Sequence, residues 1–253
     1  MSPRGFYTLF AKEVWRFLKV AIQTIFTPVV TAVLYLMVFS QVLQDRVQVY
    51  EGVSYLAFLV PGLIMMSIIQ NAFANSSSSL IQSKMNGSLL FMLLAPLSNV
   101  EFYVAYAAAA VVRGVMVGGV LYIVSLPFVD LPLAHPGVMI GFAVLGSAVL
   151  GAMGILAGVW ADKYDQLSAF QNFFILPLSF LSGVFYSIHS LPPFWRAISH
   201  FNPFFYMIDG FRYGFFGASD VDPILSLWVT GLFFAVISAI CLFLLHKGYK
   251  LRG

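Results

Sequence analysis

Few side chains in this sequence of 253 residues could do chemistry, and they do not cluster. Asp162, Lys163 and Asp165 form a tight charged turn, a pattern typical of a solvated connection. The four histidines lie at the ends of apolar segments, without metal-ligand spacing: His135, His189, His200 and His246. No paired carboxylates occur within an apolar segment, and no Gly-rich loop ends in Gly-Lys-Ser or Gly-Lys-Thr. The residues therefore predict no hydrolysis, proton relay or nucleotide site of the chain's own.

Arg113 is the one charged side chain deep within an apolar segment. Charge is expensive in hydrocarbon, so an intramembrane arginine is a candidate functional residue. Two interpretations are open. Arg113 could be a structural anchor that pairs with Asp162 or Asp165 or reaches the inner headgroups. It could also act in substrate binding or conformational coupling.

The composition predicts an all-α integral membrane protein. Hydrophobic residues make up 60% of the chain and charged residues only 9%, whereas roughly 25% charged is usual in soluble proteins. Mean hydropathy is +0.92. The basic residues behind the net charge of +3 lie at segment ends, which favours membrane topology over a nucleic-acid partner. The single cysteine, Cys241, lies in an apolar run and indicates neither a disulfide nor a redox role.

The N-terminal stretch Arg4–Lys19 has the pattern of an amphipathic helix. Its apolar residues follow helical spacing: Phe6, Leu9, Phe10, Val14, Phe17 and Leu18. Its basic residues occupy the other side: Arg4, Lys12, Arg16 and Lys19. Such a helix lies in the membrane interface, with its cations near anionic lipid headgroups. The alternative is a first membrane span that starts early. No cleavable signal is expected, because charges interrupt this stretch.

Six apolar segments of about 20 residues follow, each long enough to span a bilayer. We place them at Val20–Leu43, Tyr55–Ser76, Phe102–Phe128, Val138–Trp160, Leu167–Ser187 and Ile224–His246. The chain is thus expected to be a single transmembrane domain, residues 1–253. It comprises an interfacial helix at 1–19, six spans within 20–246 and a tail at 247–253.

The distribution of Lys and Arg predicts that both termini are cytoplasmic. Six spans leave the termini on one side of the membrane. Nine basic residues lie on that side: Arg4, Lys12, Arg16, Lys19, Lys84, Lys163, Lys247, Lys250 and Arg252. Three lie on the opposite side: Arg46, Arg196 and Arg212. Cytoplasmic loops carry the excess of positive charge.

Small residues mark two spans for close packing. Gly114 and Gly118 form a GxxxG pair, and so do Gly154 and Gly158. Such spacing lets helix backbones approach each other in a bilayer. We therefore expect these glycines to be structural.

The connection Asn75–Asn99 contains a short apolar piece that cannot span. Its serine-rich start is expected to end or weaken the second span. Leu89–Leu94 is apolar, but Lys84 and Gly87 before it and Pro96 after it exclude a full span. A short apolar helix at the membrane face must bury its side chains against its own bundle or against a partner.

The stretch Asn172–Gly217 is the most unusual part of the sequence. Its first part, to Ser187, is apolar enough to cross a bilayer, but prolines and charges interrupt the rest: Pro192, Pro193, Pro203, Arg196, Asp209 and Arg212. The remainder is nonetheless rich in aromatic residues, which suit the outer interface. Asp209 and Arg212 are expected to pair at i, i+3 spacing.

With these stretches in place, the chain resembles an ABC-2 type transporter permease, the membrane subunit of an ATP-binding-cassette exporter. The resemblance covers essentially the whole length. Its most specific parts are Lys84–Ser98, KMNGSLLFMLLAPLS, and the run Pro177–Gly217. Recurring elements in that run are Leu181–Gly183, Leu191–Pro192, Asn202–Pro203 and Arg212.

The resemblance implies a homodimer in the cell inner membrane that recruits two copies of a separate ATPase, which would hold ATP and Mg. A cytoplasmic coupling helix between spans 2 and 3 would dock on that ATPase together with the N-terminal helix. The docking residues implied are Lys84, Gly87, Leu90, Phe91, Leu93 and Pro96. Many relatives carry an acidic residue just after the glycine that aligns with Gly87. This chain has Leu90 and Phe91 there, so an apolar contact would have to serve.

The resemblance also implies a re-entrant outer hairpin between spans 5 and 6 that caps the pathway. The residues expected at this outer gate are Phe201, Phe204, Phe205, Asp209 and Arg212. A pathway for amphipathic cargo needs polar groups that face a lumen. The candidates are Gln70, Asn71, Asn75, Gln171, Asn172, Ser179 and Ser182. These groups could equally form hydrogen bonds between helices.

Two other classes of function are weighed against the exporter subunit. A membrane-embedded enzyme acting on lipid-linked substrates would need a cluster of His, Asp or Glu at one membrane face, and the sequence has none. A passive channel or lipid scramblase would work without an ATPase. An adjacent gene for an ATP-binding cassette would favour the exporter. The cargo, the partner ATPase and the choice between homodimer and heterodimer stay open.

Overall fold

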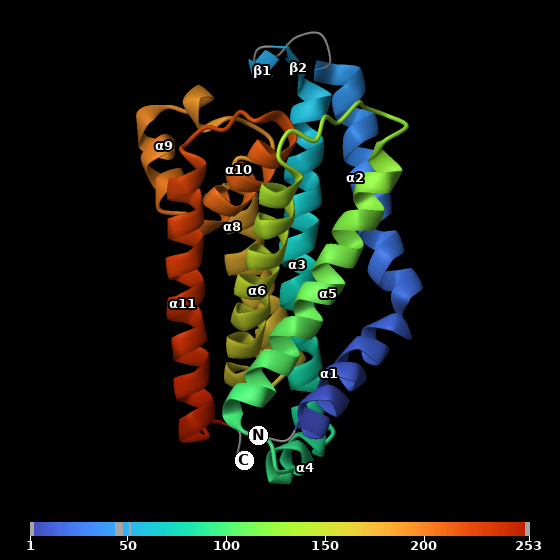
Figure 1. Cartoon of the computed structure of the whole chain (residues 1–253), viewed down its shortest axis with the longest axis vertical. Helices are drawn as coiled ribbons and strands as arrows, with labels where there is room; N and C mark the ends of the chain where they lie inside the picture. The colour runs from blue at the N-terminus through green and yellow to red at the C-terminus, as the bar shows by residue number, and fades with distance from the viewer. Residues whose placement is uncertain (1–2, 44–47, 51, 251–253) are drawn as a thin grey trace.

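The computed structural model describes residues 3–43, 48–50 and 52–250. Two residues of the charge count, Arg46 and Arg252, lie outside the described residues, as does the end of the predicted tail, residues 251–253. Figure 1 shows an elongated bundle in which both chain ends and α4 lie at one end, called here the terminal end. The strands and α9 lie at the other, called the hairpin end.

The described chain is almost entirely helical. In order, the elements are α1 (Pro3–Leu18), α2 (Ala21–Leu43), β1 (Gln48–Tyr50), β2 (Val53–Ser54), α3 (Tyr55–Met85), α4 (Ser88–Leu94), α5 (Asn99–Ser125), α6 (Pro136–Trp160), α7 (Tyr164–Phe170), η1 (Gln171–Ile175), α8 (Leu176–Phe180), η2 (Ile188–Ser190), α9 (Pro193–His200), α10 (Pro203–Phe216) and α11 (Pro223–Lys247). The strands form a short antiparallel pair that the sequence did not predict.

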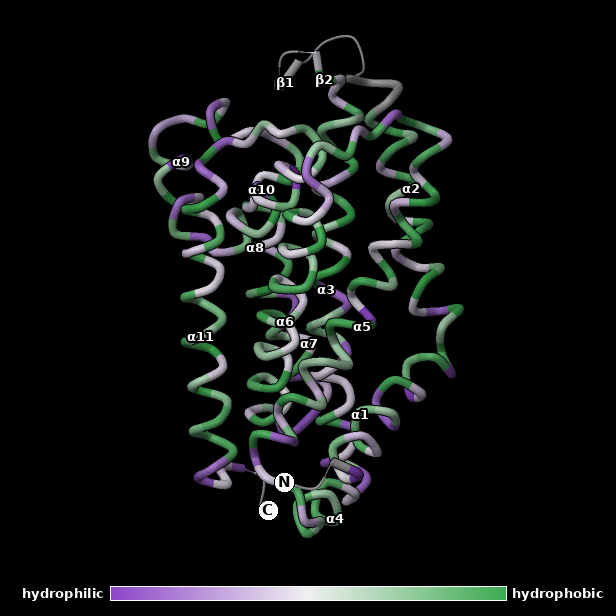
Figure 2. The backbone as a smooth tube through the Cα atoms, in the orientation of Figure 1, coloured by the Kyte–Doolittle hydropathy of each residue, from purple (hydrophilic) through white to green (hydrophobic). Residues whose placement is uncertain are grey.

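Five of the described helices are long and apolar enough to cross a membrane: α2, α3, α5, α6 and α11. They correspond to predicted spans 1 to 4 and 6. Figure 2 shows α11 as largely hydrophobic along its length and hydrophilic at the terminal end. The helix α3 is the centre of the bundle and packs against α5, α6 and α10.

The predicted fifth span is wrong at its outer end. Helical structure begins at Tyr164, passes through the π-helical segment η1 and ends at Phe180 rather than at Ser187. Gly183 then takes a left-handed conformation (φ +74°), which favours glycine. Its carbonyl accepts a hydrogen bond from Arg212 Nη2 at 2.8 Å, which holds the turned chain in place. The count of six spans stays a prediction.

Of the expectation that the serine run ends or weakens the second span, the first alternative is wrong for the helix, because α3 continues to Met85. Ser77 donates its hydroxyl to the carbonyl of Phe73, one turn back, at 2.8 Å. Ser79 donates to Glu13 Oε1 on α1 at 2.9 Å. These bonds satisfy the hydroxyls within the helix and against α1, so the run does not break α3.

The glycine pairs have the packing role that the sequence predicts. A Cβ on Gly154 would lie 2.5 Å from the carbonyl oxygen of Phe73, and one on Gly158 would lie 2.7 Å from Leu80 Cβ. Gly114 and Gly118 of α5 face Ile68 on α3 in the same way. The backbones of α5 and α6 therefore approach α3 more closely than any larger residue would allow.

Two prolines begin the helices of the hairpin end. Pro193 starts α9 and Pro203 starts α10, where a missing N–H leaves no donor unpaired. Asn202 caps α10 through a bond from Phe204 N to its side-chain oxygen. The pair α9–α10 is thus a helical hairpin, and α10 packs on α3, α6 and α11.

Candidate functional site

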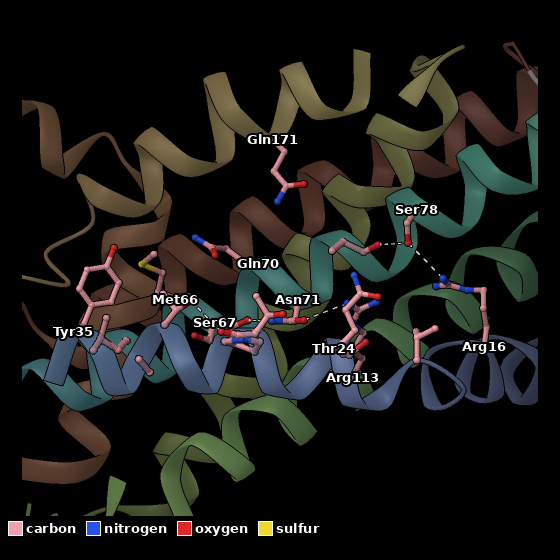
Figure 3. A pocket seen from close by; sticks show the side chains of 18 residues that line it. Arg16, Thr24, Tyr35, Met66, Ser67, Gln70, Asn71, Ser78, Arg113 and Gln171 are labelled. Atoms are coloured by element: carbon pink, nitrogen blue, oxygen red, sulfur yellow. Dashed lines mark hydrogen bonds between the residues drawn. The ribbon is translucent and has the colours of Figure 1, made fainter. Parts of the chain in front are cut away.

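A polar cavity of 540 Å³ lies beside α3, on the side covered by α2. Its walls come from α1, α2, α3, α5 and η1. The lining residues are Arg16, Val20, Gln23, Thr24, Thr27, Pro28, Thr31, Ala32, Tyr35, Leu63, Met66, Ser67, Gln70, Asn71, Ala74, Ser78, Arg113 and Gln171. Figure 3 shows Gln171 entering the cavity from the side opposite α2.

The charge in this lining is of one sign. Arg16 and Arg113 line the cavity, and no carboxylate does. The wall on α2 is a stripe of hydroxyls, because Thr24, Thr27 and Thr31 are spaced so that they lie on one helix face. Thr31 donates to the carbonyl of Thr27 at 3.0 Å. The result is a cationic, hydroxyl-rich cavity between apolar helices.

Arg16 is fixed at the terminal end of the cavity by a dense set of bonds. Its Nη2 donates to the carbonyl and the side-chain oxygen of Asn75 at 2.7 and 3.0 Å, and its Nε pairs with Glu13 at 3.2 Å. Glu13 is fully buried and also pairs with Lys12 at 2.8 Å. Two cations thus share one carboxylate. This network ties α1 to α3 where α1 meets the cavity.

Arg113 does not pair with Asp162 or Asp165, so that expectation is wrong. Its Nη2 donates to Asn71 Oδ1 at 3.3 Å across the gap between α5 and α3 (Figure 3). Its Nε is buried without a hydrogen-bond partner. No ion pair to Arg113 occurs within residues 3–43, 48–50 and 52–250. The partner of Arg113 is thus the neutral amide of Asn71 and not the carboxylate of Asp162 or Asp165.

The predicted pathway residues separate into four groups. Asn71 and Gln171 line the cavity, and so does Gln70. Asn75 is buried beside it and holds Arg16. Asn172 faces outward and is exposed. The remaining two, Ser179 and Ser182, are buried and donate to carbonyls of their own segment, those of Ile175 and Ser179.

An apolar groove of 540 Å³ lies between α1 and α4 at the terminal end. Its lining from α1 is Arg4, Gly5, Thr8, Leu9 and Lys12, and its lining from α4 and the segment that follows is Ser88, Phe91, Met92, Ala95, Pro96 and Leu97. Phe91 is 75% exposed and Leu94 is 73% exposed, whereas Leu89 of the same helix is buried. The helix therefore presents unburied apolar side chains beside two cations.

The six predicted docking residues do not share one environment. Leu90, Phe91 and Pro96 are exposed, and Leu93 packs partly against the bundle. Gly87 is the exposed N-cap of α4 and takes a left-handed conformation (φ +68°) that glycine allows. Lys84 instead faces inward. It donates to the carbonyls of Val159 and Ala161 at the end of α6, so its N–H groups serve the bundle.

The turn after α6 is an ion-pair cluster rather than an open loop. Asp162 pairs with Lys250 at 2.6 Å and with Lys84 at 3.8 Å. The hydrogen bond from Lys250 holds the pKa of the Asp162 carboxyl below its ordinary value. These contacts fix the end of α11 to the ends of α3 and α6.

The expected pair between Asp209 and Arg212 does not form. Asp209 is fully buried and accepts hydrogen bonds from the backbone N–H groups of Asp220 and Val221 at 2.8 and 3.2 Å. Arg212 is also fully buried, bonds Gly183 and lies over the ring of Phe58 at 3.8 Å from its centroid. Each residue therefore fixes a different piece of chain against α10.

The aromatic residues expected at the outer gate are mostly core residues. Phe204 and Phe205 have no exposed surface in the folded chain. Phe204 belongs to the main apolar core with Met207 and Phe211. Phe201, in the turn between α9 and α10, is 89% exposed. Of the five predicted gate residues, only Phe201 is open to an outside contact.

Sequence reasoning missed two parts of the site. The threonine stripe on α2 carried a signal, since Gln23, Thr24, Thr27 and Thr31 recur at helical spacing in an otherwise apolar segment. Arg16 carried none, because its spacing fits the solvated face of α1 as well as it fits the cavity. Arg16 reaches Asn75 because of the way α1 packs against α3, which the sequence does not reveal.

These features define a class: a multi-pass helical membrane protein with a cationic cavity among its spans. Residues 4–216 match the family of ABC-2 type transporters. Over 247 residues the chain is 39% identical to the inner membrane transport permease YadH of Escherichia coli strain K12, an alignment that covers 97% of this chain and 96% of YadH. The chain therefore belongs to the ABC-2 type transporter family.

A more distant similarity extends over most of the chain. Nodulation protein J of Rhizobium leguminosarum bv. viciae is 26% identical over 225 residues, which are 86% of this chain and 85% of that protein. A second protein of that name, from Sinorhizobium fredii strain NGR234, is 22% identical over 167 residues and covers 64% of this chain.

Proposed function

We propose that this chain is the permease subunit of an ATP-driven exporter, located in the inner membrane with both termini in the cytoplasm. Two copies would form the pathway, and two copies of a separate ATPase would hold ATP and Mg. Membership of the ABC-2 type transporter family and the similarity to YadH, an inner membrane transport permease, support this role. The observation that carries the proposal is the exposed apolar groove between α1 and α4.

The groove has the properties of a docking surface for a soluble subunit. It combines an apolar floor with cations at its edge, Arg4 and Lys12. Exposed side chains such as Phe91 and Leu94 gain most from a partner that removes them from water. The surface is attached to a fixed part of the bundle, because Lys84 joins the ends of α3 and α6, and Lys250 joins the end of α11 to Asp162. A movement imposed on α4 would thus reach α3 directly.

The cavity supports a pathway shared between two copies. A single chain closes it only in part, and α2, which forms its outer wall, is largely exposed along its length. Polar groups on α2 and α3 would be poorly solvated if lipid covered this face. A second copy with the same polar lining would complete the enclosure. The interaction between copies would then also cover the apolar face of α2.

We further propose that the hairpin α9–α10 re-enters the membrane from outside and closes the pathway there. The support is its position at the end opposite α4 and its two proline-started helices (Figure 1). Because Phe204 and Phe205 are buried, closure would depend on movement of the whole hairpin. Phe201, exposed at its turn, is available for contact, as are Phe194 and Trp195 of α9.

The test is reconstitution. The chain is co-expressed with each ATP-binding cassette that neighbouring reading frames encode, purified through a tag on the chain and assayed for ATP turnover in proteoliposomes. We expect the ATPase to co-purify and its turnover to depend on the chain. Failure of every neighbouring cassette to associate, or turnover that ignores the chain, would contradict the proposal.

A further inference from the structure

Of the two arginines that line the cavity, Arg113 is the one whose hydrogen-bonding capacity is largely unused in the described structure. A guanidinium carries five N–H donors. In the described parts of the chain, one bond is formed, from Nη2 to Asn71 at 3.3 Å, and Nε is buried without a partner. Arg16, by contrast, donates from Nε, Nη1 and Nη2. Arg113 is thus a cation with spare donors at membrane depth.

The surroundings of Arg113 select for an anion. Glu13 does not neutralise Arg113, because its carboxylate already pairs with Arg16 and Lys12. The rest of the lining offers neutral donors, including the hydroxyls on α2 and the amides of Gln70 and Gln171. The Nε2 of Gln70 is also buried without a partner. A cation with neutral donors around it and no carboxylate in the lining is the arrangement that binds an oxyanion.

We propose that the cavity binds an oxyanion, a phosphate or carboxylate group carried by the cargo, with Arg113 as its principal ligand and Arg16 as a second positive charge. Describing that oxyanion as cargo rests on the proposed function, whereas its binding does not. The site is large enough for a headgroup at 540 Å³. A separate apolar cleft between α2 and α5, on another face of α2, is lined by Ile22, Ile25, Phe26, Val29 and Val120, which suit an acyl chain.

The oxyanion could belong to a lipid headgroup or to a soluble molecule, and one experiment separates these sources. The full-length chain, purified in detergent, is given equal amounts of phosphatidylglycerol and phosphatidylcholine. Retained lipid is measured by native mass spectrometry. In a second arm the chain is given inorganic phosphate or pyrophosphate alone. Neither arm contains an ATPase, so a failure of ATPase association leaves this result independent.

Two variants address Arg113 in different ways. Arg113→Gln removes the charge. Asn71→Asp keeps the arginine and nearly preserves the shape of the side chain at position 71. The amide oxygen that Arg113 contacts becomes a carboxylate oxygen, which would compete with a bound anion. We expect each to reduce anion retention roughly tenfold, since charge-assisted hydrogen bonds supply most of the binding. Lys247→Gln, which removes an exposed cation outside the cavity, is the control and should retain anions like the parent chain.

The outcomes decide the matter. Selective retention of phosphatidylglycerol that both variants lose supports a lipid headgroup. Binding of phosphate or pyrophosphate that both variants lose supports a soluble oxyanion. Equal retention of the two lipids with no phosphate binding would overturn the proposal, and so would variants that bind anions as the parent chain does. If Arg113→Gln does not fold, Asn71→Asp alone carries the test.

Discussion

Two apolar helices of this molecule, α4 and α10, have opposite relations to the bundle. On α4, Phe91 and Leu94 project from the terminal end and only Leu89 is buried. In α10, Phe204 and Phe205 are completely buried, and the exposed aromatic residues of the hairpin, Phe194, Trp195 and Phe201, lie in α9 and in the turn before α10. Both regions drew attention in the sequence for the same reason, their excess of apolar residues.

The difference shows what such an excess means in each place. The helix α10 packs on α3, α6 and α11, so its aromatic residues have partners within the chain. The seven-residue helix α4 contacts mainly the end of α3 and cannot bury both of its faces. Apolar residues that remain exposed on a rigid, short helix indicate a partner. The helix α10 is therefore a structural element first, and α4 is the surface that we propose for interaction with the partner.

The largest expected effect is in the hairpin. Replacing Phe204 with Ala leaves a cavity in the main core and should destabilise the chain by about 3 kcal/mol. For a protein of this size, the midpoint of thermal unfolding in detergent should fall by roughly 6–12 °C. Phe201→Ala, in the same hairpin but exposed, is the matched control and should leave the midpoint unchanged. Equal effects of the two substitutions would remove the distinction between core and surface in the hairpin.

A smaller loss is expected at the base of α4. Lys84→Met removes the donor that two carbonyls at the end of α6 share, those of Val159 and Ala161. Leaving them unpaired should cost about 1–3 kcal/mol, seen as a lower unfolding midpoint. Because Lys84 faces the bundle, association with the ATPase should be unaffected. Loss of association without loss of stability would show that Lys84 belongs to the docking surface after all.

The smallest effect depends on pH. The hydrogen bond from Lys250 lowers the pKa of Asp162, so this contact stabilises the folded chain above the ordinary aspartate pKa of about 3.9. Its contribution is lost as the pH falls through the lowered value. Asp162→Asn should therefore unfold at a lower temperature than the parent near pH 7, and the gap should close toward pH 3. Asp130→Asn, an exposed aspartate at the hairpin end, is the control.

Much of the fold was predictable because hydropathy in a membrane protein is strongly constrained. In lipid, the backbone N–H and C=O groups of a spanning segment must form hydrogen bonds with each other. An apolar run of sufficient length is therefore expected to form a helix. This is why α2, α3, α5, α6 and α11 follow the sequence. The pattern of α1 and the short helix α4 were also legible, from helical spacing and from the charges that flank Leu89–Leu94.

The rest depended on contacts that no spacing reveals. Asp209 and Arg212 are correctly spaced to pair, yet the loop after α10 supplies backbone donors to Asp209, and Gly183 supplies the acceptor for Arg212. Arg113 bonds the side-chain amide of Asn71 rather than an aspartate, because α5 packs against α3 at Asn71. The expected partner Asp162 lies at the terminal end, where it pairs with Lys250. Which groups meet in contacts of this kind depends on where the helices cross each other in the folded chain.

The central claim is that the exposed face of α4 is where the ATPase binds. The most direct measurement is co-purification of the ATPase with Phe91→Asp, compared with Phe128→Asp, a matched change beyond the other end of α5. We predict that Phe91→Asp lowers the retained ATPase at least tenfold while the unfolding midpoint stays the same, because Phe91 buries little in the chain alone. Phe128→Asp should retain the ATPase fully. Undiminished association of Phe91→Asp would contradict the account.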